Sequence, residues 1–220
     1  SNNEKKFILL TNAPRPNLTV INTLKKMGLN NFYDTVFTSG EASKRYLLEN
    51  FNNKKFFHLG PPRDFDLFKT FESNKVLNID DSDYLLCSGL FEEYENDLGY
   101  YKTLLLKHIN KKMICTNPDL VVDRGDKREY CAGSIAKSFE EINGEVIYFG
   151  KPYPPVYEIA ADVCNKKILC IGDNLNTDIK GANIQNFDSL LITGGIHRRE
   201  ITKLSINKLL KNYETKINYF

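Results

Sequence analysis

The residues best suited to chemistry form one short run, Gly172-Asp173-Asn174-Leu175-Asn176-Thr177-Asp178, directly after an apolar stretch. The run 167–171, which is apolar after Lys167, predicts a buried strand that would deliver Asp173 at its carboxyl end, where ligands bind in open α/β sheets. Asp178 lies at the start of a predicted helix, so the two carboxylates can converge. Oxygen ligands without histidine or cysteine suit Mg²⁺. On spacing alone, a turn capped by aspartate explains this run equally well.

Two weaker signals also follow apolar runs. Thr11 and Asn12 directly follow the apolar run 7–10, and their side chains together with the next backbone N–H groups can cradle a phosphate. Lys151 follows residues 146–149 between glycine and proline, where it could offer a fixed ammonium to a phosphoryl oxygen. Taken singly, an ordinary polar turn explains each of these better.

The elements that must position these groups alternate along the chain. The apolar periodicity predicts strands and helices in turn, which indicates an α/β protein with parallel sheets. Asn17 is expected to cap the first helix and Gly28 to end it. The predicted strands are 7–10, 35–38, 55–59, 75–79, 84–87, 112–116, 146–149, 167–171 and 189–193, and the predicted helices are 17–27, one through 46–48, 65–71, 100–109, 134–142, 155–164, 177–182 and 200–211.

Composition excludes several other classes. The 30 basic and 28 acidic residues are interspersed, so no field for nucleic acid is indicated. The run His197-Arg198-Arg199 is interpreted as a solvated helix start. No apolar run approaches the roughly 20 residues of a membrane helix. The five cysteines contain no CxxC pair, which favours reduced, buried thiols in a cytoplasmic protein.

Taken together and in this order, the three signals are far more specific than any one of them. The chain resembles the haloacid dehalogenase superfamily, and more closely its class IIA, NagD-like phosphatases with a C2-type cap, in an alphaproteobacterial branch. The resemblance rests on the segments Leu9-Leu10-Thr11-Asn12-Ala13-Pro14-Arg15-Pro16, Asn117-Pro118-Asp119, Cys131-Ala132-Gly133-Ser134, Gly150-Lys151-Pro152, the run 172–182 and Thr193-Gly194-Gly195-Ile196-His197.

The resemblance implies a fold and its division. It implies a Rossmann-like parallel core built from residues 1–52 and 147–220, with an inserted α/β cap formed by residues 53–146. Caps in this group often mediate dimers, so a homodimer through the cap is one expectation. No partner among nucleic acids or membranes is expected.

The resemblance also implies roles, residue by residue. Thr11 and Asn12 would bind the phosphoryl oxygens, and Lys151 would neutralise charge on the phosphate and the nucleophile. Asp173 would ligate Mg²⁺, Asp178 would hold the metal directly or through water, and Asn174 would assist. Asn117 and Asp119, from the cap, would face the substrate.

The chain departs from the family at its start. The family's nucleophilic aspartate and its acid/base partner lie on the strand before the Thr11 strand. A βαβ unit needs roughly 30 residues, and Thr11 has ten before it. We therefore expect the parent protein to supply that strand upstream of Ser1, and the chain from Ser1 not to hold the family fold unaided. The pair Asp81 and Asp83 has the right spacing but is interpreted as a loop.

Two hypotheses of function follow. The first is a Mg²⁺-dependent phosphatase that hydrolyses a small phosphomonoester, a phosphorylated metabolite, through an aspartyl-phosphate. The second is a truncated or decayed relative that binds phosphate and Mg²⁺ without catalysis. The retained Thr11, Lys151, Asp173 and Asp178 favour the first, and the absent nucleophile favours the second.

Overall fold

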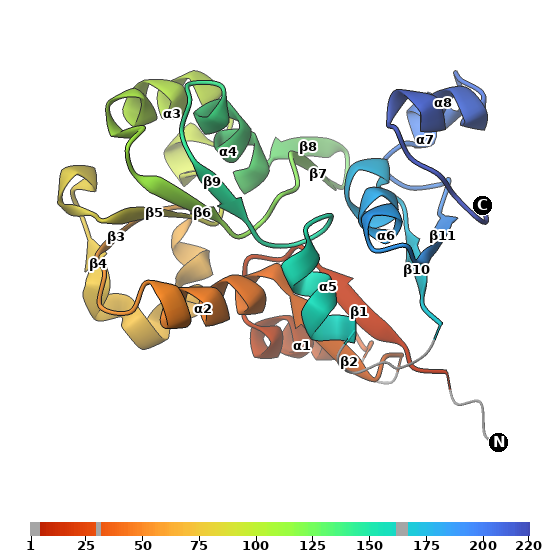
Figure 1. Ribbon diagram of the computed structural model, residues 1–220, viewed down its shortest axis with the longest axis horizontal. Helices are drawn as coiled ribbons and strands as arrows, with labels where there is room; N and C mark the ends of the chain where they lie inside the picture. The colour runs from red at the N-terminus through yellow and green to blue at the C-terminus, as the bar shows by residue number, and fades with distance from the viewer. Residues whose placement is uncertain (1–4, 30–31, 162–166) are drawn as a thin grey trace. The chain divides into compact units, whose positions relative to one another are not determined.

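The structure is a computed structural model that describes residues 5–29, 32–161 and 167–220 (Figure 1). The chain divides into two compact units, residues 1–150 and 151–220, and each is described by itself. Within the described residues, every strand pair is parallel except one hairpin, so the predicted α/β class is confirmed. Across the described part of the chain, no helix has the length and apolar character needed to cross a bilayer.

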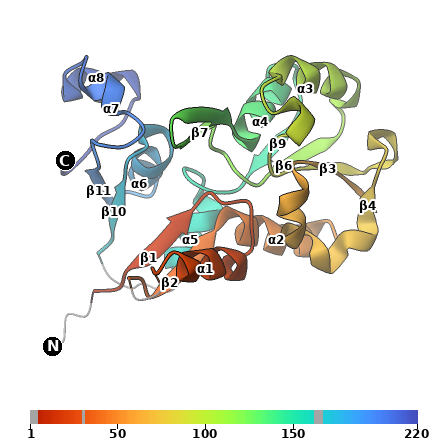
Figure 2. The ribbon, with the colours of Figure 1, turned by 180° about the vertical axis from the view of Figure 1, so that it is seen from behind.

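The largest sheet of the first unit has five parallel strands in the order β4-β3-β5-β6-β9. Its central strand β5 is buried at all four positions, because neighbours flank it on both edges and helices cover it. Helices α3 and α4 pack on one face and bury a core that includes Leu85, Met113 and Phe139 (Figures 1 and 2). The strands are β3 (Phe56–Leu59), β4 (Lys75–Val76), β5 (Tyr84–Cys87), β6 (Lys112–Cys115) and β9 (Val146–Tyr148), and the helices are α3 (Leu98–Leu105) and α4 (Ala132–Glu140).

A second, two-stranded sheet in this unit pairs β1 (Ile8–Thr11) with β2 (Thr35–Thr38). Helix α1 (Asn17–Lys26) connects them, and α2 (Ser39–Asn50) follows. Gly28, at φ +78°, terminates α1 as expected. The predicted cap is wrong: Pro16 occupies the N-cap, and Asn17 Oδ1 instead accepts the N–H of Thr38, which ties α1 to the end of β2.

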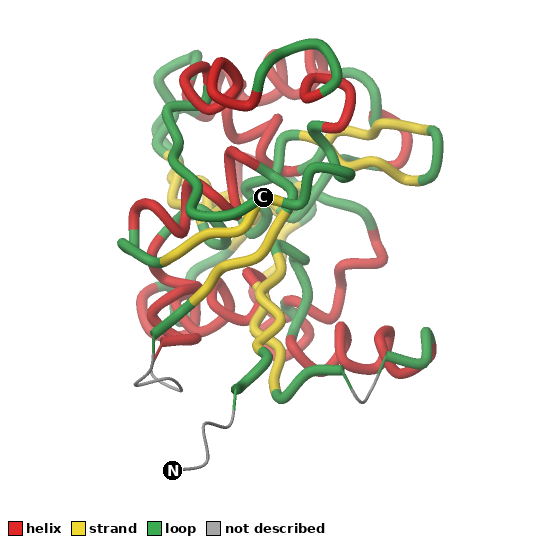
Figure 3. Tube along the Cα trace, turned by 90° about the vertical axis from the view of Figure 1, so that its right-hand side faces the viewer, coloured by secondary structure: helices red, strands yellow, loops and turns green. Residues whose placement is uncertain are grey.

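A hairpin that the periodicity did not predict follows β6. Strands β7 (Val121–Arg124) and β8 (Lys127–Tyr130) pair antiparallel, and Figure 3 shows them as two yellow strands joined by a tight turn. Gly125, at φ +61°, supplies the left-handed conformation that such a turn requires. Charged residues interrupt the apolar pattern here, which is why the sequence did not predict strands.

Several predicted elements of the first unit are shorter or broken. The predicted helix 65–71 is replaced by the 3₁₀ helices η1 (Pro62–Leu67) and η2 (Lys69–Asn74), and the predicted strand 75–79 shortens to β4. The predicted helix 100–109 continues beyond α3 only as a 3₁₀ turn. The remaining 3₁₀ helices are η3 (Ile79–Asp81), η4 (Glu92–Tyr94) and η5 (Leu106–His108).

In the described part of the second unit, β10 pairs parallel with β11. Leu175, Ile179, Leu191 and Leu209 form its buried core. The predicted helix 200–211 is two helices, because Ser205 caps a new start with its side chain. The elements are α5 (Pro154–Ala161), β10 (Leu169–Gly172), the π-helical turn η6 (Leu175–Ile179), α6 (Lys180–Ile184), β11 (Asp188–Leu191), α7 (Arg198–Ile201) and α8 (Ile206–Asn212).

The predicted division into domains is not tested by these units. The predicted cap, residues 53–146, holds most of the five-stranded sheet, and β9 begins at its last residue. The proposed assembly of residues 1–52 with 147–220 into one core stays a prediction.

The described cysteines are free thiols. Cys87 and Cys115 are buried opposite each other on β5 and β6, and burial raises the pKa of Cys115 to about 12. Cys131 and Cys170 are half-buried. The fifth, Cys164, lies outside the described residues.

Candidate active site

The loop after β1 carries the first pair of predicted residues. Thr11 Oγ1 accepts the N–H of Ala13 at 3.2 Å, and a hydroxyl in that role keeps its own proton to donate. Asn12 is 5% exposed and donates from Nδ2 to Asp119 Oδ1 at 3.0 Å. Ala13 O accepts from Gly40 N and from Ser39 Oγ, so the loop is fixed on the first turn of α2.

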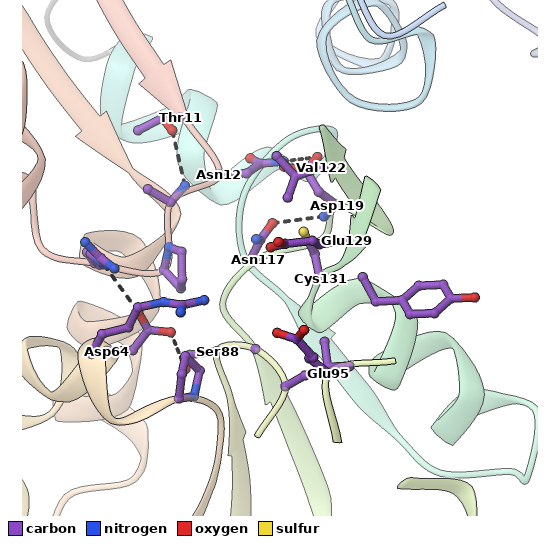
Figure 4. A pocket seen from close by; sticks show the side chains of 18 of the residues that line it. Thr11, Asn12, Asp64, Ser88, Glu95, Asn117, Asp119, Val122, Glu129 and Cys131 are labelled. Atoms are coloured by element: carbon purple, nitrogen blue, oxygen red, sulfur yellow. Dashed lines mark hydrogen bonds and ion pairs between the residues drawn. The ribbon is translucent and has the colours of Figure 1, made fainter. Parts of the chain in front are cut away.

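The segment after β6 carries the second pair. Asn117 Oδ1 accepts the N–H of Asp119 at 3.0 Å, a local turn that aims the Asp119 carboxylate at Asn12. Thr11, Asn12, Asn117 and Asp119 line one cavity of about 450 Å³ in the first unit. Figure 4 shows Asn12, Asn117 and Asp119 grouped together. The structure thus brings together two pairs of residues that the sequence places far apart.

Three residues that line the same cavity, Arg15, Asp64 and Ser88, form a hydrogen-bonded chain that His58 extends behind Ser88, and we call these four residues the arginine wall. Ser88 Oγ donates to Asp64 Oδ2 at 2.9 Å (Figure 4). Arg15 Nε donates to Asp64 Oδ1 at 3.3 Å, and His58 Nε2 lies 2.8 Å from Ser88 Oγ. None of these four residues was predicted to have a role. They come from separate segments, and no local spacing relates them. Arg15 alone lies close in sequence to a predicted site residue, Asn12.

Burial sets the charges of the arginine wall. Burial raises the pKa of Asp64, while Ser88 and Arg15 counter that rise. Burial, and then the charge of Lys75, lower the pKa of His58 to about 3. His58 is therefore neutral near pH 7. Since Ser88 Oγ donates its hydrogen to Asp64, it accepts from His58, so His58 Nε2 carries the hydrogen of this second bond.

The second unit holds the predicted metal residues on what we call the carboxylate loop, residues 172–178. β10 ends at Gly172, and η6 begins two residues beyond Asp173. Lys151 Nζ donates to Asp178 Oδ1 at 2.6 Å, and the N–H of Asn174 donates to Asp178 Oδ2 at 3.1 Å. The N–H of Ile196 donates to Asp173 Oδ2 at 2.9 Å. Lys151, Asp173 and Asp178 are all partly buried here.

Glycines let the backbone approach both carboxylates. A Cβ on Gly172 would lie 2.2 Å from Asp178 Cγ, and one on Gly195 would lie 2.0 Å from Asp173 Oδ2. Each aspartate is therefore seated against bare backbone, with one oxygen fixed by an N–H group. Among the described residues, no three His, Cys, Asp or Glu side chains gather into a closed metal cage. An open pair of carboxylates fits Mg²⁺, which keeps several waters and takes further ligands from phosphate.

Two neighbours support this loop. Asn174 Oδ1 accepts the N–H of Asn176, so this side chain caps η6. His197 is 6% exposed, accepts the N–H of Leu175 on Nε2 at 3.2 Å, and bonds Glu200 through Nδ1. The interpretation of residues 197–199 as a solvated helix start is therefore wrong for His197, which packs beneath the loop, and holds for the exposed Arg198 and Arg199.

Two models of known protein families match the chain. Residues 1–72 match the family model of haloacid dehalogenase-like hydrolases, and residues 148–211 match a second, HAD-hydrolase-like model. No curated protein matched the chain.

Solved structures agree with the family models. A haloacid dehalogenase-like hydrolase from Brucella suis is 33% identical, with a TM-score of 0.79 over 86% of this chain and 73% of that one. The 4-nitrophenylphosphatase of Thermotoga maritima is 27% identical, with a TM-score of 0.69 over 98% and 80%. A possible sugar phosphatase from Cytophaga hutchinsonii shares the fold at 23% identity, with a TM-score of 0.74 over 96% and 79%. The chain belongs to the haloacid dehalogenase-like hydrolases, and its neighbours are consistent with the NagD-like class.

Proposed function

We propose that this protein is a Mg²⁺-dependent phosphatase that releases phosphate from a small phosphomonoester. The observation that carries the proposal is the carboxylate loop, where Lys151 Nζ lies 2.6 Å from Asp178 and Asp173 directly follows the end of β10. An ammonium beside an oxygen-only metal site is suited to the charge of a transferring phosphoryl group. The relative named as a 4-nitrophenylphosphatase acts on such an ester.

The proposed roles follow from the donors and acceptors. Thr11 would donate its hydroxyl proton, and Asn12 its amide, to the phosphoryl oxygens. Asp173 and Asp178 would hold Mg²⁺, with Asn174 keeping the loop in shape. The metal would supply Lewis-acid stabilisation of phosphoryl charge. Asp119 accepts hydrogen bonds only, so it suits a hydroxyl of the substrate rather than its phosphate.

The proposed nucleophile is an aspartate on a strand upstream of Ser1, which would form an aspartyl-phosphate that water then hydrolyses. Two open strand edges support a further strand. In the described chain, β1 pairs only with β2, and β10 pairs only with β11. Leu9 on β1 is 39% exposed and Ile171 on β10 is 59% exposed, which is high for apolar residues of parallel strands.

The test is phosphate release from 4-nitrophenyl phosphate by the protein together with the segment that precedes residue 1. We expect turnover that needs Mg²⁺ and stops with EDTA. Trapping the reaction with acid should leave phosphate covalently bound to an upstream aspartate. Absence of phosphate release from a panel of phosphomonoesters by the folded, Mg²⁺-supplied protein would overturn the proposal and favour a non-catalytic, phosphate-binding relative.

The localisation, the substrate class and the oligomeric state of the enzyme are also proposals. We propose a cytoplasmic enzyme that acts on a phosphorylated metabolite and forms a homodimer through residues 53–146. Sedimentation of the purified protein tests the dimer, and loss of the dimer on substitution within that segment tests the surface.

A further inference from the structure

The arginine wall holds a guanidinium in an unusually defined position. Arg15 follows the loop that carries Thr11 and Asn12, and its carbonyl oxygen accepts the hydroxyl of Thr38 at 2.6 Å. A Cβ on Gly40 would lie 2.3 Å from Arg15 N, so the backbone of this loop packs tightly on α2. Both the main chain and the side chain of Arg15 are therefore fixed.

The residue that orients Arg15 is itself rigid. The Asp64 side chain is 4% exposed, and its two oxygens are divided between Arg15 Nε and Ser88 Oγ. His58 backs Ser88 from a position that is 6% exposed. A buried carboxylate with every partner satisfied holds one geometry, because rotation would leave a buried polar atom unpaired.

This arrangement uses only one of the nitrogens of Arg15. Its Nε faces Asp64, while neither Nη group has a partner among residues 5–29, 32–161 and 167–220. The Arg15 side chain is 32% exposed and lines the cavity with Thr11 and Asn12. Arg63 lines the same cavity, is exposed, and makes no ion pair within the described chain. Two guanidinium groups thus offer open donors to one space.

The acidic side of the cavity is already neutralised in part by one protein cation, Lys127. Figure 4 shows Glu95 and Glu129 across the cavity from Asp64 and Ser88. Lys127 Nζ lies 2.9 Å from Glu95 and 3.7 Å from Glu129. The open cationic donors therefore lie on the arginine side, and an anionic group would bind there.

We propose that Arg15 determines specificity by binding a second acid group of the ligand, a carboxylate or a second phosphate, beside the phosphoryl group. This inference rests on the proposed phosphatase function. A guanidinium whose Nε is held by a carboxylate presents its Nη groups as a fork that matches two oxygens of an acid. The cavity of about 450 Å³ has the size of a small-molecule site. Arg63 supplies additional charge at the exposed end.

The experiment compares inert phosphonates by calorimetry, using the protein with its upstream segment and Mg²⁺ in excess over ligand. Methylphosphonate carries the phosphoryl-like group alone. Phosphonoacetate adds a carboxylate, and methylenediphosphonate adds a second phosphate. We expect at least one of the two diacids to bind about tenfold more tightly than methylphosphonate, and whichever gains more identifies the second acid group.

Variants assign that gain to the side chain. In Arg15→Gln, the ratio of the diacid's affinity to that of methylphosphonate should fall close to one, while methylphosphonate still binds. Arg15→Lys should restore part of that ratio. Arg45→Gln, an exposed arginine on α2 outside the cavity, is the matched control and should leave the ratio unchanged.

Each contrary result has a distinct meaning. Equal binding of all three phosphonates to the unaltered protein, or a ratio that survives in Arg15→Gln, overturns the role of Arg15 and leaves the phosphatase standing. Absence of binding by all three, methylphosphonate included, overturns both proposals.

Discussion

The carboxylate loop and the arginine wall are both built around buried or half-buried aspartates, but they are held in opposite ways. In the carboxylate loop, Asp178 bonds the N–H of Asn174, four residues away. In the arginine wall, Asp64 bonds Arg15 across 49 residues and Ser88 across 24. In the loop each aspartate accepts one backbone N–H, whereas Asp64 in the wall is held by side chains from segments that the pairing of β3 and β5 brings together. We therefore expect changes in the loop to act on metal and rate, and changes in the wall to act on ligand preference and stability.

The largest expected effect is Asp173→Asn in the carboxylate loop. This change removes a charge from the proposed metal site while keeping the shape and the acceptor for Ile196 N. We expect kcat/KM for phosphate release to fall about 10²–10³-fold, because preorganised charge at a phosphoryl group supplies several kcal/mol. Titration calorimetry should show weaker Mg²⁺ binding. Asp188→Asn, an aspartate paired with Lys167 at the start of β11, is the control and should retain activity. Full activity in Asp173→Asn would remove this residue from the metal site.

A smaller effect is expected from the backbone that seats Asp173. Gly195→Ala would place a Cβ 2.0 Å from Asp173 Oδ2, whereas a Cβ on Gly194 would meet nothing within 4 Å. The clash must displace the carboxylate, so we expect Mg²⁺ affinity to fall about 10–100-fold, as when the support of a metal ligand is lost. Gly194→Ala should leave the affinity unchanged. Equal Mg²⁺ affinities in the two variants would show that the contact with Gly195 does not position Asp173.

The arginine wall should respond to pH instead. Because the pKa of His58 falls from 6.5 to about 3 on folding, protonation favours the unfolded chain. The stability that neutral His58 contributes is complete above pH 6.5 and is lost progressively as pH falls toward 3. Between pH 6.5 and 5 the loss is about 2 kcal/mol in the free energy of unfolding.

Urea unfolding at several pH values measures this difference. His58→Gln can still donate to Ser88 but does not titrate, so its unfolding free energy should fall less than that of the unaltered protein over the same interval. Parallel curves for the two proteins would mean that His58 is not held neutral by burial.

The same contrast explains how far the sequence could predict the molecule. Asp173, Asn174 and Asp178 of the carboxylate loop could be singled out from the sequence because they lie within a few positions of one another, directly after an apolar run. Strands such as β5 were predicted because their apolar runs are short and continuous. The arginine wall was missed because Arg15, Asp64 and Ser88 meet only after β3 and β5 pair. The β7–β8 hairpin was missed because charged residues interrupt the alternation of apolar and polar residues in its two strands. Asn17 was misassigned as a cap because its side chain instead accepts a hydrogen bond from the N–H of Thr38, which is distant in sequence.

The smallest expected effect concerns the other closely spaced aspartates, Asp81 and Asp83. Asp83 Oδ2 accepts the N–H of Lys55 at 2.7 Å, which joins the residues just before β3 and β5. Asp83 therefore lies at the amino ends of these parallel strands, whereas Asp173 follows the carboxyl end of β10, the edge at which α/β sheets bind ligands. Asp83→Asn should change the rate of phosphate release by less than about twofold, because a carboxylate at the amino edge is remote from that chemistry. A loss comparable to that of Asp173→Asn, in a protein that unfolds normally in urea, would make Asp83 part of the reaction and would show that spacing, rather than the edge of the sheet, selects the reactive aspartate.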